Sequence, residues 1–271
     1  MLNDKMIEIE KLENHYLNKY YYFLKFAEDE MIYGFKTKFS IKDDWQDKWN
    51  PTEEGKGISD FATGAERIVY SLLNGKGIGQ PNSAPIGSDL FFETQDAYVH
   101  IDLKTVQTRN IGDYKKSIFV GNNQNSYNGK FLVSGKEREY DQACLPTFYT
   151  KNKGTDLQEV KQCISLFITI LYDEESLEIL SIAILCMPNG ELYKEYKGKV
   201  LSAGKVLYPK GHELRETHAK SVRFNFSNVD TFNLLEGDNK RVKVVYFNER
   251  MDSKYLQELD YIKSIYDSQK E

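Results

Sequence analysis

The sequence predicts a mixed α/β protein whose central mixed β-sheet is flanked by helices. Two consecutive runs, 163–172 and 179–187, are continuously apolar and rich in β-branched residues, which is typical of buried strands. Segment 98–106 alternates apolar and polar residues, as a half-buried strand does. Residues 4–31 and 58–77 instead repeat apolar side chains at helical spacing. Such strands and helices assemble most simply around one shared sheet.

The ends of the chain extend this outline. A helical segment covers about residues 1–35, and the run 241–247 predicts a late strand. Residues 253–269 predict one amphipathic helix that closes the chain. With 271 residues, of which 40% are hydrophobic, the chain can bury one large core, so we expect a single domain spanning residues 1–271.

Composition argues against several classes of protein. No run approaches the roughly 18 apolar residues of a membrane span. The charged N-terminal stretch is unlike a secretory signal, so we expect a cytoplasmic protein with no membrane partner. Cys144, Cys163 and Cys186 form no CxxC pair and lie in or near apolar segments. We therefore expect reduced, buried thiols and neither disulfides nor zinc ligands.

One predicted β-hairpin carries two carboxylates and an ammonium group. Asp102 and Lys104 share one face of strand 98–106, with their Cα atoms about 6.6 Å apart. Asp89 begins the short run DLFFE, which the linker TQDA would fold back beside that strand. Mg²⁺ takes oxygen ligands and usually needs only one or two protein carboxylates. The hairpin therefore predicts a site for a hard divalent cation.

Asp89 and the DLK of residues 102–104 resemble the PD-(D/E)xK nuclease superfamily, and within it the type II restriction endonucleases. The resemblance implies a restriction-endonuclease-like fold and Mg²⁺-dependent hydrolysis of DNA phosphodiester bonds, with one or two Mg²⁺ ions per active site. Asp89, Asp102 and the main-chain carbonyl of Leu103 would hold the metal. Lys104 would orient the attacking water, because two nearby anions oppose the lowering of the pKa that a lysine base requires.

The same resemblance implies the partners of the protein. Type II enzymes recognise a short, usually palindromic sequence in double-stranded DNA as homodimers, whose two-fold axis matches that of the site. It implies no small-molecule cofactor. The chain departs from the family pattern in one respect, since Ser88 stands where a proline often precedes the first aspartate.

The helix predicted at 58–77 supplies a further carboxylate. Glu66 borders its apolar stripe, a place where a carboxylate usually has a partner. Nucleases of the resembled family often carry an inward-leaning glutamate on a helix before the hairpin. We therefore expect Glu66 to make an additional or water-mediated metal contact. The alternative is a surface ion pair with lysine or arginine.

Two segments are candidates for DNA contacts, the first within residues 107–140. Its amides suit adenine in the major groove and its cations suit phosphates, although a solvated, turn-rich loop is the alternative. The candidate residues are Gln107, Arg109, Asn122, Asn123, Gln124, Asn125 and Lys130. The amides make a target containing A·T pairs a reasonable guess.

The second candidate segment is 194–223. The whole chain has a formal net charge of −5, which by itself does not favour binding to phosphates. This segment, however, holds eight basic and three acidic residues. It could line a DNA cleft or form an ordinary solvated surface. The residues of this segment that we expect to contact DNA are Lys205, Lys210 and Arg215.

Two other functions stay open at this point. One is a DNA repair or junction-resolving nuclease of the same superfamily, although the length of the chain favours added recognition elements. The other is a non-catalytic DNA-binding or interaction protein, in which Asp89, Asp102 and Lys104 form only a surface ion-pair group. His100 shares the strand face of Asp102, and we expect it to be structural; the alternative is a place bordering the phosphate.

Overall fold

The central element is a mixed β-sheet of order β1-β2-β3-β8-β9-β12, to which β7 adds by pairing with β8. The structure is a computed structural model, and it describes residues 2–40, 60–74, 80–81, 89–133, 135–140, 142–152, 158–204 and 222–270. The strands of the sheet are β1 (Gln80–Pro81), β2 (Leu90–Glu93), β3 (Ala97–Gln107), β7 (Phe148–Asn152), β8 (Gln158–Tyr172), β9 (Ile179–Met187) and β12 (Val242–Phe247).

The pairing of these strands explains their sequence patterns. β3 runs parallel to β8, whereas β8 and β9 form an antiparallel pair in the middle of the sheet. Every residue of β9 is buried, which is why its sequence is continuously apolar. The strand predicted at 179–187 has these bounds in the structure, whereas the one predicted at 163–172 begins earlier, at Gln158.

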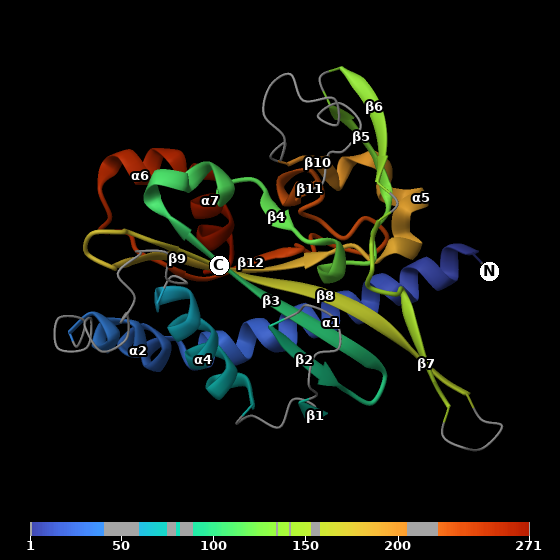
Figure 1. Cartoon of the computed structure of the whole chain (residues 1–271), viewed down its shortest axis with the longest axis horizontal. Helices are drawn as coiled ribbons and strands as arrows, with labels where there is room; N and C mark the ends of the chain where they lie inside the picture. The colour runs from blue at the N-terminus through green and yellow to red at the C-terminus, as the bar shows by residue number, and fades with distance from the viewer. Residues whose placement is uncertain are drawn as a thin grey trace, which may run out of the picture.

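Helices α1 (Leu2–Phe26), α2 (Glu28–Ser40) and α4 (Asp60–Asn74) cover one face of the sheet, below it in Figure 1. Most of their buried side chains pack with the apolar face of β3 in one core cluster, whereas Met6 and Ile9 of α1 belong to the second cluster. The prediction of a single helix over residues 4–31 is wrong in detail, because the helix breaks at Ala27 and a second helix, α2, continues to Ser40. Helical hydrogen bonds from Ala27 N to Phe23 O and from Met31 N to Ala27 O continue across the break.

The opposite face of the sheet is covered by α6 (Ser253–Glu258), α7 (Asp260–Ser268) and a three-stranded sheet of order β10-β11-β4 (Figure 1). That sheet consists of β10 (Leu201–Ala203), β11 (Val222–Phe224) and β4 (Ile118–Val120), and a separate hairpin of β5 (Gly129–Val133) and β6 (Lys136–Tyr140) lies beside it. The prediction of one C-terminal helix is wrong, since Leu259 leaves the helical conformation and is fully buried.

Short helical turns connect these elements. They are η1 (Thr108–Asp113), η2 (Asn122–Gln124), η3 (Gly190–Leu192), α5 (Tyr193–Tyr196), η4 (Lys197–Lys199) and η6 (Phe226–Asn228). Among the residues described, no helix is long and apolar enough to cross a membrane. Cys163 and Cys186 are buried free thiols as predicted, but the expectation for Cys144 is wrong because its thiol is exposed. Cys144 lies in the irregular stretch before β7, where no regular element covers it.

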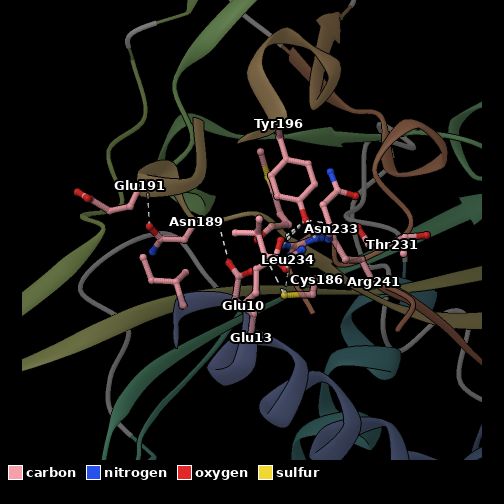
Figure 2. Close-up of polar contacts among 12 residues, drawn as sticks. Glu10, Glu13, Cys186, Asn189, Glu191, Tyr196, Thr231, Asn233, Leu234 and Arg241 are labelled. Carbon is pink, nitrogen blue, oxygen red and sulfur yellow. Dashed lines mark hydrogen bonds and ion pairs between the residues drawn. The ribbon is translucent and has the colours of Figure 1, made fainter. Parts of the chain in front are cut away.

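A fully buried charge cluster ties α1 to the rest of the molecule (Figure 2). The guanidinium of Arg241 lies 2.8 Å from Glu13 Oε2 and 3.3 Å from Glu10 Oε1, and it donates to the hydroxyl of Tyr196. Glu13 also accepts from the backbone N–H of Asn189 at 2.7 Å. Burial raises the pKa of Glu13 against the opposing effect of Arg241. These residues come from four separate segments, so we assign the cluster a structural role.

Candidate active site

The β2–β3 hairpin places Asp89 beside Asp102, as the sequence predicts. Leu90 pairs with Ile101, so Asp89, the residue before β2, lies at the end of the strand pair next to Asp102. Asp89 Oδ2 accepts a hydrogen bond of 2.6 Å from the backbone N–H of Leu103, which fixes the carboxylate against β3. The hairpin brings both carboxylates together where β2 begins, beside the middle of β3.

Asp102 and Lys104 lie side by side on the polar face of β3 and form an ion pair. Asp102 is only 4% exposed, and this burial raises its pKa to about 7. Lys104 lowers the pKa of Asp102, and the negative charge of Asp89 raises it again. Even with Lys104 beside it, a buried carboxylate next to a second carboxylate stays costly to ionise, so this pair suits a further positively charged ligand.

Glu66 on α4 faces the same group of charges. It is half-buried, and burial raises its pKa, followed by the negative charge of Asp89. The exposed Arg67 acts in the opposite direction. Ala65, Val69 and Leu73 bury the apolar face of α4, which fixes this helix against the sheet. The structure thus places Glu66 within electrostatic reach of Asp89.

The donor atoms of this site fit a hard divalent metal ion. Asp89 and Asp102 offer carboxylate oxygens, and Mg²⁺ usually keeps several waters and uses one or two protein carboxylates. Within the described parts of the chain, no group of three or more histidine, cysteine, aspartate or glutamate side chains is arranged to hold a metal. The fit therefore rests on two carboxylates and not on a complete cage of protein ligands.

Gln124 occupies a place that sequence reasoning did not assign to it. Its amide Nε2 donates to Asp102 Oδ1 at 2.6 Å, and its Oε1 accepts from Lys104 Nζ at 3.0 Å. The side chain that the sequence suggested as a DNA contact is thus bonded to the two charged residues of β3. Gln124 follows Asp102 by 22 residues and Lys104 by 20, a separation at which neither helical nor strand periodicity signals a contact.

The other amides and cations of the first candidate segment fall into distinct environments. Asn125 is fully buried and donates to the carbonyl of Gly121, so its amide does not face solvent. Asn123 and Lys130 are exposed, and Lys130 pairs with Glu137 at 3.0 Å. Asn122 is half-buried and accepts from the hydroxyl of Tyr140 at 2.8 Å.

A pocket beside Lys104 contains two of the predicted DNA contacts. Gln107 and Arg109 line it together with Asn110 and Phe119. Both candidates therefore lie in the same pocket as Leu103 and Lys104 of β3. Lys205, Lys210 and Arg215 lie outside the described residues.

His100 is placed as a structural residue, not at the surface of the site. It is 2% exposed, its ring lies 4.6 Å from that of Phe91, and burial lowers its pKa to about 3. Neither ring nitrogen has a hydrogen-bond partner within the described structure. This environment does not leave His100 in contact with solvent or with a phosphate.

Comparison with protein families identifies the chain. The model of the N-terminal domain of the type II restriction enzyme MwoI matches residues 5–176, and the model of its central domain matches residues 179–247. The chain belongs to the family of the type II restriction enzyme MwoI. A search of curated proteins found no match.

Two solved structures share the fold of this MwoI family member. The restriction endonuclease BglI bound to its DNA recognition sequence superimposes with a TM-score of 0.67 at 17% identity, covering 90% of this chain and 92% of that chain. The tetrameric restriction endonuclease SfiI bound to cognate DNA gives a TM-score of 0.65 at 15% identity, covering 91% and 87%. The predicted restriction-endonuclease-like fold is confirmed, and the family makes the protein a type II site-specific deoxyribonuclease.

Proposed function

We propose that this enzyme hydrolyses phosphodiester bonds of double-stranded DNA at a short, palindromic site in a Mg²⁺-dependent reaction, as a homodimer of single-domain subunits in the cytoplasm. The observation that carries the proposal is the meeting of Asp89, Asp102 and Lys104 at one end of the β2–β3 hairpin. The DNA bound in the BglI and SfiI structures supports DNA as the substrate. SfiI is described as tetrameric, so the number of subunits needs its own measurement.

In this proposal the side chains of the site have separate roles in metal binding and in orienting the attacking water. Asp89, Asp102 and the carbonyl of Leu103 hold one or two Mg²⁺ ions, and Glu66 adds a direct or water-mediated contact. Bound Mg²⁺ supplies Lewis-acid stabilisation of the charge on the scissile phosphate. Lys104 orients the attacking water and stabilises negative charge in the transition state.

The proposed DNA contacts surround this site. Gln107 and Arg109 would reach the duplex from the pocket beside Lys104, and Asn123 and Lys130 from the exposed surface around η2 and β5. Asn122 is half-buried and would contribute its exposed part. The proposed cationic contacts outside the described residues are Lys205, Lys210 and Arg215.

Plasmid digestion with a titration of Mg²⁺ tests the proposal. We expect discrete fragments, whose sequenced ends share one recognition site, and no cleavage in EDTA. Asp102→Asn should abolish cleavage while the protein stays folded. Structure-dependent nicking without a common sequence would instead indicate a repair or junction-resolving nuclease. Retained cleavage by purified Asp102→Asn would reject the site.

A further inference from the structure

The side chain of Gln124 bridges the two charged residues of β3. Its Nε2 lies 2.6 Å from Asp102 Oδ1, and its Oε1 lies 3.0 Å from Lys104 Nζ. We propose that Gln124 is a positioning residue of the nuclease site, which sets the orientation of the Asp102 carboxylate and of the Lys104 ammonium. This inference rests on the proposed roles of Asp102 and Lys104.

The backbone determines which way the Gln124 amide points. The N–H of Gly121 donates to Gln124 Oε1 at 2.7 Å, so the oxygen must face Gly121 and the amide nitrogen must face away from it. With this orientation the amide oxygen meets the ammonium of Lys104, and the amide N–H meets the carboxylate of Asp102. Both are charge-assisted hydrogen bonds, in which the amide donor meets the anion and the amide acceptor meets the cation.

The rest of the turn holds this amide in place. Asn125 Nδ2 donates to the carbonyl of Gly121 at 2.9 Å, which fastens the start of η2. A Cβ on residue 121 would lie 2.9 Å from Asn123 Oδ1 and 3.1 Å from Gln124 Oε1. Glycine at position 121 therefore leaves the space into which the Gln124 side chain folds back.

The nuclease site needs such a bridge because Asp102 and Lys104 attract one another directly. An ammonium bound only to Asp102 would be drawn toward the carboxylate that has to serve as a metal ligand. Gln124 Oε1 gives Lys104 a second, neutral acceptor, and Nε2 restrains rotation of the Asp102 carboxylate. Groups that orient metal ligands in this way typically change metal affinity or activity by about 10–100-fold when they are removed.

The test compares Gln124→Leu and Gln124→Glu with Gln257→Leu, a matched change of an exposed glutamine on α6. Leucine removes both contacts, whereas glutamate keeps an acceptor for Lys104 and places a negative charge against Asp102. We expect both Gln124 variants to lower kcat for cleavage of the plasmid by about 10–100-fold. We expect the KM for the plasmid and its metal-free binding to change by less than about twofold, and Gln257→Leu to match the wild type.

Each result has a defined meaning. Wild-type kcat in either Gln124 variant would overturn the proposal, and so would a change confined to KM, because Gln124 would then be a DNA contact. If Gln124→Leu does not melt cooperatively, Gln124→Asn decides. It keeps the amide but withdraws it by one methylene, so unchanged kcat in this variant would also overturn the proposal. Digestion by Asp102→Asn in parallel distinguishes failure of this inference from failure of the proposed function. Retained cleavage by Asp102→Asn would reject the nuclease site itself, whereas wild-type kcat in a Gln124 variant would reject only the positioning role of Gln124.

Discussion

Replacing Asp102 by asparagine is expected to abolish cleavage and to remove a pH-dependent loss of stability from the metal-free protein. The carboxylate is 4% exposed, and its pKa is raised from 3.8 to about 7, mainly by burial. Because the folded state binds this proton more tightly than the unfolded chain does, the contribution of Asp102 to stability is fully present below pH 3.8. It is lost as the pH rises toward 7.

The magnitude follows from the size of this shift. At about 1.4 kcal/mol per pKa unit, a rise from 3.8 to about 7 corresponds to roughly 4 kcal/mol of unfolding free energy across the whole range. Asparagine has the same shape and carries no titrating proton. The unfolding free energy of Asp102→Asn minus that of the wild type should therefore increase by about 1.4 kcal/mol per pH unit between pH 5 and pH 7. It should then level off.

Urea denaturation in EDTA at pH 5, 6, 7 and 8 measures this difference. Asp29→Asn, which removes an exposed carboxylate from α2, controls for the loss of one negative charge. Mg²⁺ should stabilise the wild type more at pH 8 than at pH 6, because the ionised carboxylate is the form that binds a metal. A difference between variant and wild type that stays constant from pH 5 to pH 8 would refute the reasoning, since Asp102 would then not ionise at a cost in the folded protein.

Further predictions concern four other side chains. Lys104→Ala should lower the cleavage rate at least about 100-fold with little change in DNA binding, and near-normal turnover would contradict its role. Glu66→Gln should lower the rate about 10-fold and raise the Mg²⁺ concentration needed for half-maximal cleavage, whereas an unchanged Mg²⁺ titration would leave it a surface carboxylate. Arg109→Ala should weaken DNA binding and reduce the slope of log K against log salt by about 1, and an unchanged slope would exclude a phosphate contact. Arg241→Met should lower the unfolding free energy by about 3–5 kcal/mol, because it leaves the buried Glu10 and Glu13 without a cation. A loss below about 1 kcal/mol by urea denaturation would show that the cluster is not structural.

Local patterns in the sequence were enough for the sheet and for part of the site. The position of β9 could be predicted because burial on both faces makes its sequence almost continuously apolar. The alternation along β3 located that strand, but the expectation that it is half-buried is wrong, because residues 97–103 are all buried and His100 and Asp102 are enclosed on the polar face. The same alternation places Asp102 and Lys104 on one face, and the short link to β2 brings Asp89 to them. Helical periodicity predicted the helices but not where they break. A single non-helical residue, Ala27 or Leu259, hardly changes the spacing of the apolar positions on either side of it.

Contacts between distant segments were decided by tertiary structure alone. Glu10 and Glu13 lie on the buried side of α1, yet their partner Arg241 is more than 200 positions away, and nothing local identifies it. Likewise, Gln124 looks in the sequence like one amide among several in a polar loop. Only the packing of η2 against β3 turns its amide toward Asp102 and Lys104. Periodicity specifies which face of an element is buried, whereas the partner that meets a polar group on that face depends on how separate elements pack.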